Sequence, residues 1–198
     1  MATDGTGTRP HARGRGLVVA SYRLPLLPGD IPVGRGCDAC GAPPRTPRRG
    51  SDAGAPRALV TALAPVLRRE RGTWVGCPTE PPEPGARPFA VEGRDVGSGY
   101  AVAPVPLSPE ECRGLQVGLP DAVLWPLCHG FPTRCRFDGR LWQTYRRTNR
   151  RFAGVIQRVS AARAPVWVHD HHLMEVALYM RARGRENPVG YFHSIPFP

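Results

Sequence analysis

The sequence predicts an α/β fold built on a mostly parallel sheet, and two observations carry that prediction. First, β-branched runs alternate along the chain with segments of helical periodicity. Second, the last part of the chain holds a complete βαβ unit: Val166–His169 predicts a buried strand, Leu173–Ala182 a helix, and Val189–Phe192 a second strand. Polar residues follow both strands, at the edge where open α/β sheets bind ligands.

The N-terminal elements follow from short apolar runs. Leu17–Ser21 (LVVAS) predicts a buried strand, from which Tyr22–Pro25 turns away. Apolar residues at helical spacing predict a helix over Ala58–Arg69. Pro65 lies inside this segment and is expected to kink or shorten the helix, because proline removes a hydrogen bond and clashes with the preceding turn. Trp74–Gly76 predicts the next strand.

Three segments are expected to lie outside the packed domain. Residues 1–15 are polar and basic and are interpreted as a disordered arm. Residues 26–56 and 78–99 are rich in Gly and Pro and are interpreted as loop or disordered inserts. The partial domain therefore spans residues 16–198.

The central part of the chain continues the alternation. Tyr100–Leu107 predicts a strand, and Ser108 followed by Pro109 predicts a helix start. The clearest helix is Arg140–Val159, in which apolar residues share one face and the arginines between Arg146 and Arg158 lie mainly off that face. Those arginines are interpreted as a solvated helix surface.

Composition excludes several classes of protein. All 27 basic residues are Arg and the formal net charge is +11, but the arginines are scattered and no nucleic-acid-binding motif accompanies them. A nucleic-acid partner is therefore not expected. No stretch is apolar enough to span a membrane. Cys37 and Cys40 form one C-x-x-C pair without a second, so the six cysteines are expected to be free thiols in a cytoplasmic protein, with no metal or other cofactor.

Four residues at element ends are candidates for a functional site. Arg23 follows the first strand, where a guanidinium suits bidentate contact with a phosphate; the alternative is a surface arginine at a turn. Asp170 is either a helix N-cap or an acceptor for sugar hydroxyls. Trp125 lies in the apolar run Ala122–Leu127, where an indole stacks on a sugar ring or fills the core.

The fourth candidate, His193, precedes Ser194 near the end of the chain. Successive strand residues point to opposite faces, so only one of these two side chains is expected to face a cleft. The cluster of His169, His171 and His172 has the side chains of a metal site, but no outlying carboxylate or cysteine partner accompanies them, so no metal is expected there.

These segments together resemble the trehalose-6-phosphate synthases, the retaining GT-B enzymes of glycosyltransferase family 20. Leu17–Pro25 (LVVASYRLP) is similar to the family's LVVVSNRLP, and further segments match in the same order. They are Leu59–Pro65 (LVTALAP), Thr73–Gly76 (TWVG), Val102–Glu111 (VAPVPLSPEE), Ala122–His129 (AVLWPLCH), Trp142–Phe152 (WQTYRRTNRRF), Val166–Met174 (VWVHDHHLM) and Ile195–Pro198 (IPFP). Collinear order over eight segments makes the resemblance specific.

The resemblance implies a Rossmann-like N-terminal domain that binds glucose 6-phosphate and a C-terminal domain that binds a nucleotide sugar, usually UDP-glucose. It implies that Arg23 contacts phosphate, that Trp125 lines the acceptor pocket and that Asp170 binds a sugar hydroxyl. It also implies that the histidine of HIPFP, here His193, reaches the donor glucose and is the catalytic residue. No metal is implied.

Several positions depart from the family pattern. Arg57 and Ala58 replace a Gly-Gly pair whose backbone approaches the donor phosphates, and a side chain blocks such an approach. Gln116 stands where the family has a tyrosine that contacts the acceptor phosphate, and Cys77 replaces the second Trp of TWVGW. HDYH has become HDHH at His171, and in ungapped register Ser194 rather than His193 falls on the catalytic histidine.

We therefore expect an incomplete N-terminal domain of a GT-B glycosyltransferase, with the C-terminal donor domain absent. Such a chain binds glucose 6-phosphate, meets a nucleotide sugar only if a donor domain is supplied, and has little or no transferase activity alone. The alternatives are a non-catalytic regulatory or partner subunit that binds sugar phosphate, in a homo- or hetero-oligomer, and a pseudo-glycosyltransferase relative that joins cyclitol units.

Overall fold

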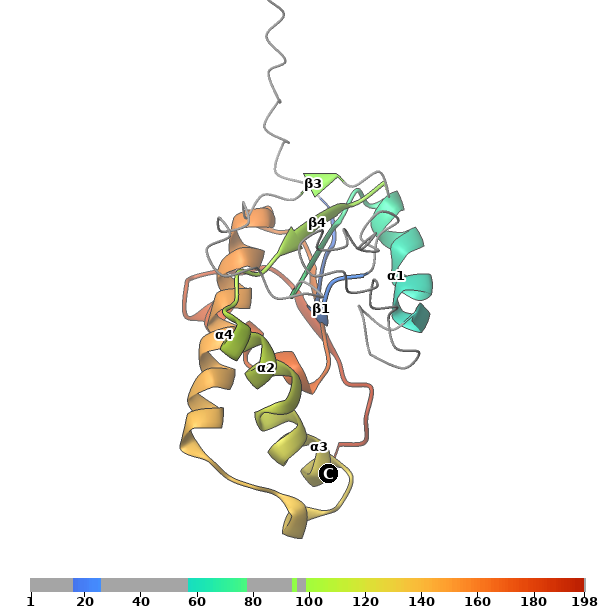
Figure 1. Cartoon of the computed structure of the whole chain (residues 1–198). Coiled ribbons are helices and arrows are strands. Elements are labelled where there is room, and N and C mark those ends of the chain that lie inside the picture. Colours follow the sequence, from blue (N-terminus) through green and yellow to red (C-terminus); the bar gives the residue numbers. More distant parts are fainter. Residues whose placement is uncertain (1–15, 26–56, 78–93, 96–98, 198) are drawn as a thin grey trace, which may run out of the picture.

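The computed structural model describes residues 16–25, 57–77, 94–95 and 99–197, which form a six-stranded sheet in the order β3-β4-β2-β1-β5-β6 (Figure 1). The strands are β1 (Val18–Arg23), β2 (Thr73–Cys77), β3 (Arg94–Asp95), β4 (Ala101–Pro104), β5 (Val166–His169) and β6 (Val189–Phe192). Five strands are parallel, and β3 pairs with β4 in the antiparallel direction. Without β3, the order is the 3-2-1-4-5 arrangement of a doubly wound Rossmann-like sheet.

Helices cover both faces of this sheet (Figure 1). They are α1 (Arg57–Arg69), α2 (Pro109–Val117), α3 (Trp125–Cys128), α4 (Gly139–Val159) and α5 (Val176–Arg181), with a π-helical turn η1 (Pro120–Leu124) and 3-10 turns η2 (Pro132–Arg134) and η3 (His171–Leu173). Helix α1 lies on one face, and α2, α4 and α5 lie on the other. The α/β prediction is therefore confirmed.

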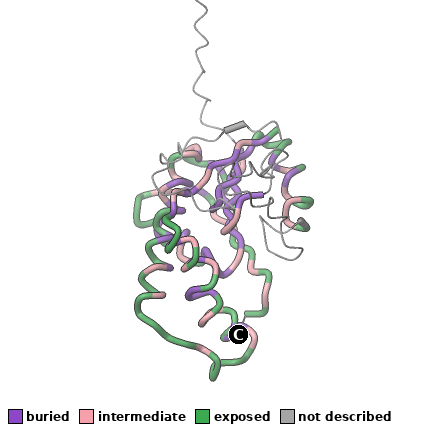
Figure 2. Tube along the Cα trace, viewed as in Figure 1, coloured by how far each residue is buried: buried purple, intermediate pink, exposed green. Residues whose placement is uncertain are grey.

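Each face of the sheet has its own apolar core, and buried residues are concentrated in the sheet (Figure 2). The larger core joins Val18, Val75 and Val168 of the sheet to Phe152 and Ile156 of α4, all of them buried. The smaller core packs α1 against Trp74, Val19 and Val102 on the opposite face. The alternation of side chains along each strand assigns neighbouring residues to different cores, as in any sheet that is covered on both sides.

Most predicted elements are confirmed within a few residues. Strands β5 and β6 have the predicted bounds, and α4 begins one residue earlier than expected. The prediction that Tyr22–Pro25 turns out of the first strand is wrong, because β1 continues through Arg23. The helix predicted over Leu173–Ala182 is present but shorter: α5 spans Val176–Arg181, and Leu173 ends the 3-10 turn η3.

Pro65 neither shortens nor ends α1, which runs without a break over 13 residues. Pro65 itself is exposed, while Ala64 and Leu67 are buried against the sheet. A proline inside a helix costs about 3 kcal/mol. Packing of the apolar face of α1 offsets that cost, so the expected interruption does not occur.

Helix α2 begins at the predicted signal. The side chain of Ser108 accepts a hydrogen bond from Glu111 N, and the carboxylate of Glu111 accepts one from Ser108 N, which completes a capping box. The apolar run Ala122–Leu127 is helical, within η1 and α3.

Other sequence predictions fall on residues 1–15, 26–56 and most of 78–99, which lie outside the described residues, although β3 belongs to the last of these segments. Cys37 and Cys40 also lie outside them. In the part of the chain that the structure describes, no helix is both long enough and apolar enough to cross a membrane.

Candidate functional site

The carboxyl ends of β1, β5 and β6 carry three of the four predicted site residues: Arg23, Asp170 and His193. We call this region the carboxyl edge. Strands β1 and β5 are adjacent in the sheet, although three strands and four α-helices separate them in the chain. The strand order reverses between them, and ligands of doubly wound folds bind at such a switch point.

Arg23 ends β1 and lies against Gln116 of α2. With the oxygen of the Gln116 amide facing Arg23, it accepts hydrogen bonds from Nη2 and from Nε, the latter at 3.1 Å. Gly76 on β2 allows β1 to come this close, because a Cβ at Gly76 would lie 2.8 Å from Arg23 C and from Leu24 N. Arg23 and Gln116 therefore form one polar corner, in which Gln116 lies beside the predicted phosphate contact.

Next to Arg23, Tyr22 stacks on His172 with ring centroids 4.1 Å apart and an angle of 11° between the rings. Burial, His171 and Arg23 together lower the pKa of His172 to about 3, so the ring is neutral near pH 7. Burial lowers the pKa values of His169 and His171 as well.

Asp170 connects the ends of β5 and β6. Its Oδ1 accepts hydrogen bonds from Ser194 N (3.1 Å) and from Ser194 Oγ. The backbone of Asp170 has φ 68° and ψ 162°, a region that is almost restricted to glycine. Asp170 precedes η3, but its side chain makes no cap hydrogen bond there. The N-cap alternative is therefore wrong, and the carboxylate is directed across the sheet edge instead.

His193 lies on the other side of Asp170. Its Nδ1 is 3.0 Å from the Tyr191 hydroxyl, and its Nε2 is 3.7 Å from Cys128 Sγ. The ring centroid is 6.1 Å from that of His171. Strand β6 ends before His193, so the expectation that strand alternation allows only one of His193 and Ser194 to face the site does not apply.

Trp125 reaches the same region through α3, the short helix that also carries Cys128. Its ring stacks on His129 at 4.0 Å and remains 43% exposed, so it does not fill the core. The His129 ring is held in turn by a hydrogen bond between Nδ1 and Trp125 O at 2.8 Å. The indole thus presents a rigid surface near the His193 side of the edge.

Helix α4 fixes the backbone of the histidine turn. The Tyr145 hydroxyl donates to His171 O at 2.8 Å and accepts from Met174 N at 3.1 Å. Asn149 Nδ2 donates to His172 O at 3.0 Å, and both Tyr145 and Asn149 are buried. These bonds hold η3 beneath the carboxyl edge without using its side chains.

Two of the predicted residues, Arg23 and His193, belong to one series of contacts; Asp170 adjoins it through Ser194, and Trp125 is joined to it only through α3. From one end, Arg23 adjoins Tyr22, which stacks on His172; the series continues through His171 and His193 to the helix that carries Trp125. Sequence reasoning missed Tyr22 and Cys128, and it named His172 only as a possible metal ligand. The HDHH cluster signalled the histidines but not their stacking partner, which is far away in the chain.

The chemistry of this edge is that of a polar binding surface. Among the described residues, no three or more His, Cys, Asp and Glu side chains are arranged to hold a metal ion. The edge offers one permanent cation, one carboxylate, neutral imidazoles and an exposed indole. Such a set suits a ligand with an anionic group at one end and hydroxyl groups at the other.

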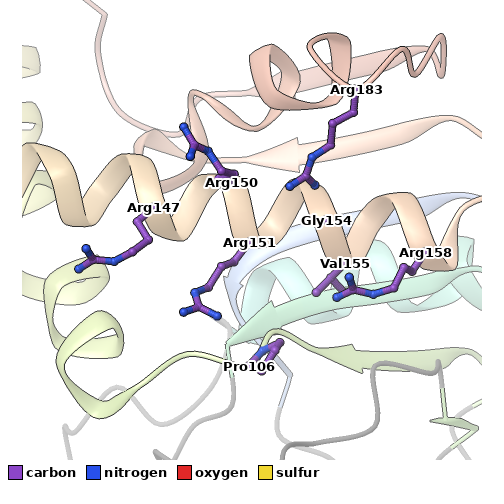
Figure 3. A pocket seen from close by; sticks show the side chains of 8 residues that line it. All are labelled: Pro106, Arg147, Arg150, Arg151, Gly154, Val155, Arg158 and Arg183. Carbon is purple, nitrogen blue, oxygen red and sulfur yellow. The ribbon is translucent and has the colours of Figure 1, made fainter.

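A second region of concentrated charge lies on α4. An open groove of about 310 Å³ is lined by Arg147, Arg150, Arg151, Arg158 and Arg183, together with Pro106, Gly154 and Val155 (Figure 3). We call it the arginine groove. Buried Glu111 binds Arg147 Nε and Arg151 Nε, each at 3.1 Å. Arg150 lies over the ring of Tyr179. None of the predicted site residues lines this groove.

Comparison with known proteins gives a consistent set of matches. A family model described as Glycosyltransferase family 20 matches residues 48–198. A trehalose-6-phosphate synthase of Mycolicibacterium gilvum is 37% identical over 143 residues, which are 72% of this chain and 28% of that protein. The chain therefore spans less than a third of the length of this curated relative.

Solved structures match in the same way. The alpha,alpha-trehalose 6-phosphate synthase of Burkholderia multivorans superposes with a TM-score of 0.70 at 27% identity, covering 92% of this chain and 34% of that one. An E. coli structure described as trehalose-6-phosphate bound with UDP-2-fluoro glucose gives a TM-score of 0.66 at 27% identity, covering 92% and 33%.

Proposed function

The chain belongs to glycosyltransferase family 20, and we propose that it is the partial N-terminal, acceptor-binding domain, residues 16–198, of a trehalose-6-phosphate synthase and binds glucose 6-phosphate at the carboxyl edge. The observation that carries the proposal is the unbroken series of contacts from Arg23 to His193. Matched relatives and structures are enzymes of this kind. The roles of the site residues follow from the resemblance of their motifs to those of the family, and the chemistry of the carboxyl edge supports them.

In the proposed complex, Arg23 binds the phosphate. Its guanidinium has two donors that fit one phosphate group, and Gln116 beside it contributes an amide donor after rotation of its side chain. Asp170 accepts hydrogen bonds from sugar hydroxyls, replacing those that it now receives from Ser194. Trp125 offers its exposed face to the sugar ring.

His193 is the residue proposed to meet the reacting end of a donor sugar. Its ring has hydrogen-bond partners on both nitrogens, which fixes its orientation. A GT-B reaction also requires a donor held against the acceptor, and positioning of this kind accounts for much of the rate enhancement. The 198 residues taken alone are therefore proposed to bind acceptor but to transfer little or no glucose from UDP-glucose.

The proposal is tested by calorimetry of the purified chain with glucose 6-phosphate. Arg23→Ala should weaken binding about 10- to 100-fold, because a hydrogen bond to a charged group contributes about 1.5–3 kcal/mol. Glucose without the phosphate should bind weakly to both proteins. Arg158→Ala, which removes an exposed arginine of α4, is the matched control and should bind like the unaltered chain.

Equal affinity of the Arg23→Ala and Arg158→Ala variants for glucose 6-phosphate would exclude Arg23 as the phosphate contact. Transfer of glucose from UDP-glucose by the chain alone, at an ordinary enzymatic rate, would contradict the second part of the proposal. We include a cytoplasmic location in the proposal, in keeping with the free thiols of the described cysteines.

A second candidate function is a non-catalytic subunit that binds sugar phosphate and pairs with another protein. It is favoured by the exposed aromatic side chains of Tyr191, Phe192 and Phe197 on and after the outermost strand β6. Light scattering of the purified chain decides between monomer and homo-oligomer. A monomer that also fails to change the activity of a full-length synthase when mixed with it would remove this candidate.

A further inference from the structure

Two thiols meet beside the phosphate corner. Cys77 is the last residue of β2 and Cys112 lies in the first turns of α2, yet their Sγ atoms are only 3.2 Å apart. A covalent S–S bond is about 2.05 Å long. Bond formation therefore requires an approach of roughly 1 Å, without any change in the order of the elements.

The two thiols differ in their surroundings. Cys77 is buried, with 5% of its surface exposed, whereas Cys112 is only partly buried. The contact between the two sulfurs lowers the pKa of Cys112 and raises that of Cys77. The N-terminal end of α2 also favours a thiolate at Cys112. Cys112 is thus the accessible nucleophile, and Cys77 lies next to it as the thiol that can resolve an oxidised Cys112.

We propose that Cys77 and Cys112 form a redox-active pair, which a hydroperoxide converts reversibly into a disulfide. The thiolate of Cys112 attacks one oxygen of hydrogen peroxide, the O–O bond breaks, and the leaving hydroxide takes up the proton that Cys112 released, which gives a sulfenic acid and water. The Cys77 thiol then attacks the sulfenic sulfur, the S–O bond breaks, and a second water leaves. Two thiols and one peroxide thus give one disulfide and two waters, and a dithiol reverses the change by exchange.

The pair is directly connected to Arg23. Cys77 and Arg23 are register partners on β2 and β1, and Leu24 N donates to Cys77 O at 2.9 Å. Cys112 and Gln116 are four residues apart on α2 and therefore share one face. A disulfide draws the start of α2 toward the end of β2, which moves Gln116 relative to Arg23. Since this step rests on the proposed function, oxidation is expected to lower the affinity for glucose 6-phosphate about threefold or more.

The first experiment is independent of any ligand. The full chain carrying Cys37→Ser and Cys40→Ser, which removes the C-x-x-C pair, is treated with hydrogen peroxide, alkylated and mapped by mass spectrometry. We expect a cross-linked peptide that joins Cys77 to Cys112, with a mass lower by two hydrogen atoms, and its loss on treatment with dithiothreitol. The proposal is overturned if Cys77 and Cys112 are both alkylated after the treatment, or if they are joined to other cysteines.

Two variants sharpen the result. In Cys77→Ser the bond cannot form, so dimedone should trap a sulfenic acid at Cys112; Cys135→Ser is the matched control and should form the disulfide normally. Unlabelled Cys112 in Cys77→Ser contradicts the order of the two steps.

Calorimetry of the reduced and the fully oxidised chain then tests the connection to Arg23, and equal affinities for glucose 6-phosphate overturn that connection. If the reduced chain binds no glucose 6-phosphate, it is the proposed function that fails, whatever the peptide map shows.

Discussion

The carboxyl edge and the arginine groove are both rich in polar groups. Several arginines of the groove have partners, whereas several buried groups at the edge have none among the described residues. On α4, buried Glu111 neutralises Arg147 and Arg151, and the ring of Tyr179 covers Arg150. At the carboxyl edge, buried nitrogens of three histidines have no hydrogen-bond partner among the described residues, and the backbone of Asp170 is strained.

The difference separates polar groups that stabilise the fold from polar groups that weaken it. Unsatisfied buried nitrogens and a glycine-like backbone angle each reduce the free energy of unfolding. A protein retains such features most often where a ligand binds. Charge density alone would have pointed to the arginine groove, whereas the pattern of satisfaction points to the carboxyl edge.

The largest effect is expected from substitutions that break the ion pairs of the arginine groove. The double variant Arg147→Ala with Arg151→Ala leaves the buried carboxylate of Glu111 without its cations. We expect a loss of about 3 kcal/mol in the free energy of unfolding, measured with urea at pH 7. Glu111→Gln, which retains an acceptor for the cap of α2, should lose less. Equal losses would mean that the cost comes from losing the ion pairs and not from leaving a buried charge unpaired.

The next effect concerns pH at the carboxyl edge. The pKa of His172 is about 3 in the folded chain and near 6.5 when unfolded, so between these values the unfolded state binds more protons. The free energy of unfolding should therefore fall as the pH is lowered from 6.5 toward 3, by at most about 1.4 kcal/mol per pH unit from this group. His172→Phe retains the stacking on Tyr22 and removes the titration.

Urea unfolding at pH 7 and at pH 5 gives, for each of the two proteins, the change in the free energy of unfolding between these pH values. That change should be smaller in the His172→Phe variant by about 1–2 kcal/mol. Equal changes in the two proteins would show that His172 is not held neutral in the fold.

A smaller effect tests the strain at Asp170. Asp170→Gly and Asp170→Ala both remove the carboxylate that binds Ser194, but only glycine adopts φ 68° and ψ 162° without strain. The glycine variant should exceed the alanine variant by about 1–2 kcal/mol in the free energy of unfolding. If the two variants are equally stable, the turn relaxes to another conformation once the carboxylate is removed.

The smallest expected effect lies at the rim of the arginine groove. Arg158 is exposed in the last turn of α4, and Arg158→Ala should change the free energy of unfolding by less than about 0.5 kcal/mol. The same urea titration measures it. A loss above 1 kcal/mol would mean that the outer arginines, like Arg147 and Arg151, contribute to the fold.

The sequence predicted the features that depend on local pattern. The apolar runs of β5 and β6 and the apolar face of α4 are clear local patterns, and packing reinforces what each pattern favours. Pro65 was misjudged because its penalty is local while the packing that offsets it is tertiary. The extension of β1 through Arg23 depends on pairing with Cys77, which no local pattern reveals.

The candidate site was predictable as a set of residues but not as a geometry. Arg23, Trp125, Asp170 and His193 were chosen because they stand at element ends or in a motif, and parallel strands bring such ends together. The stacking of Tyr22 on His172 and the approach of Cys112 to Cys77 join segments that are distant in the chain. Such contacts are decided by how layers pack, so the sequence order gave no sign of them.

The bonds from Tyr145 and Asn149 to the histidine turn have a consequence for how the molecule opens. Surface loops usually detach at a small cost in free energy, long before the core unfolds. Here the carbonyls of His171 and His172 are held by two buried side chains of the longest helix. The turn therefore belongs to the same cooperative unit as α4, and amide protons around it should exchange with solvent as slowly as those of the helix itself.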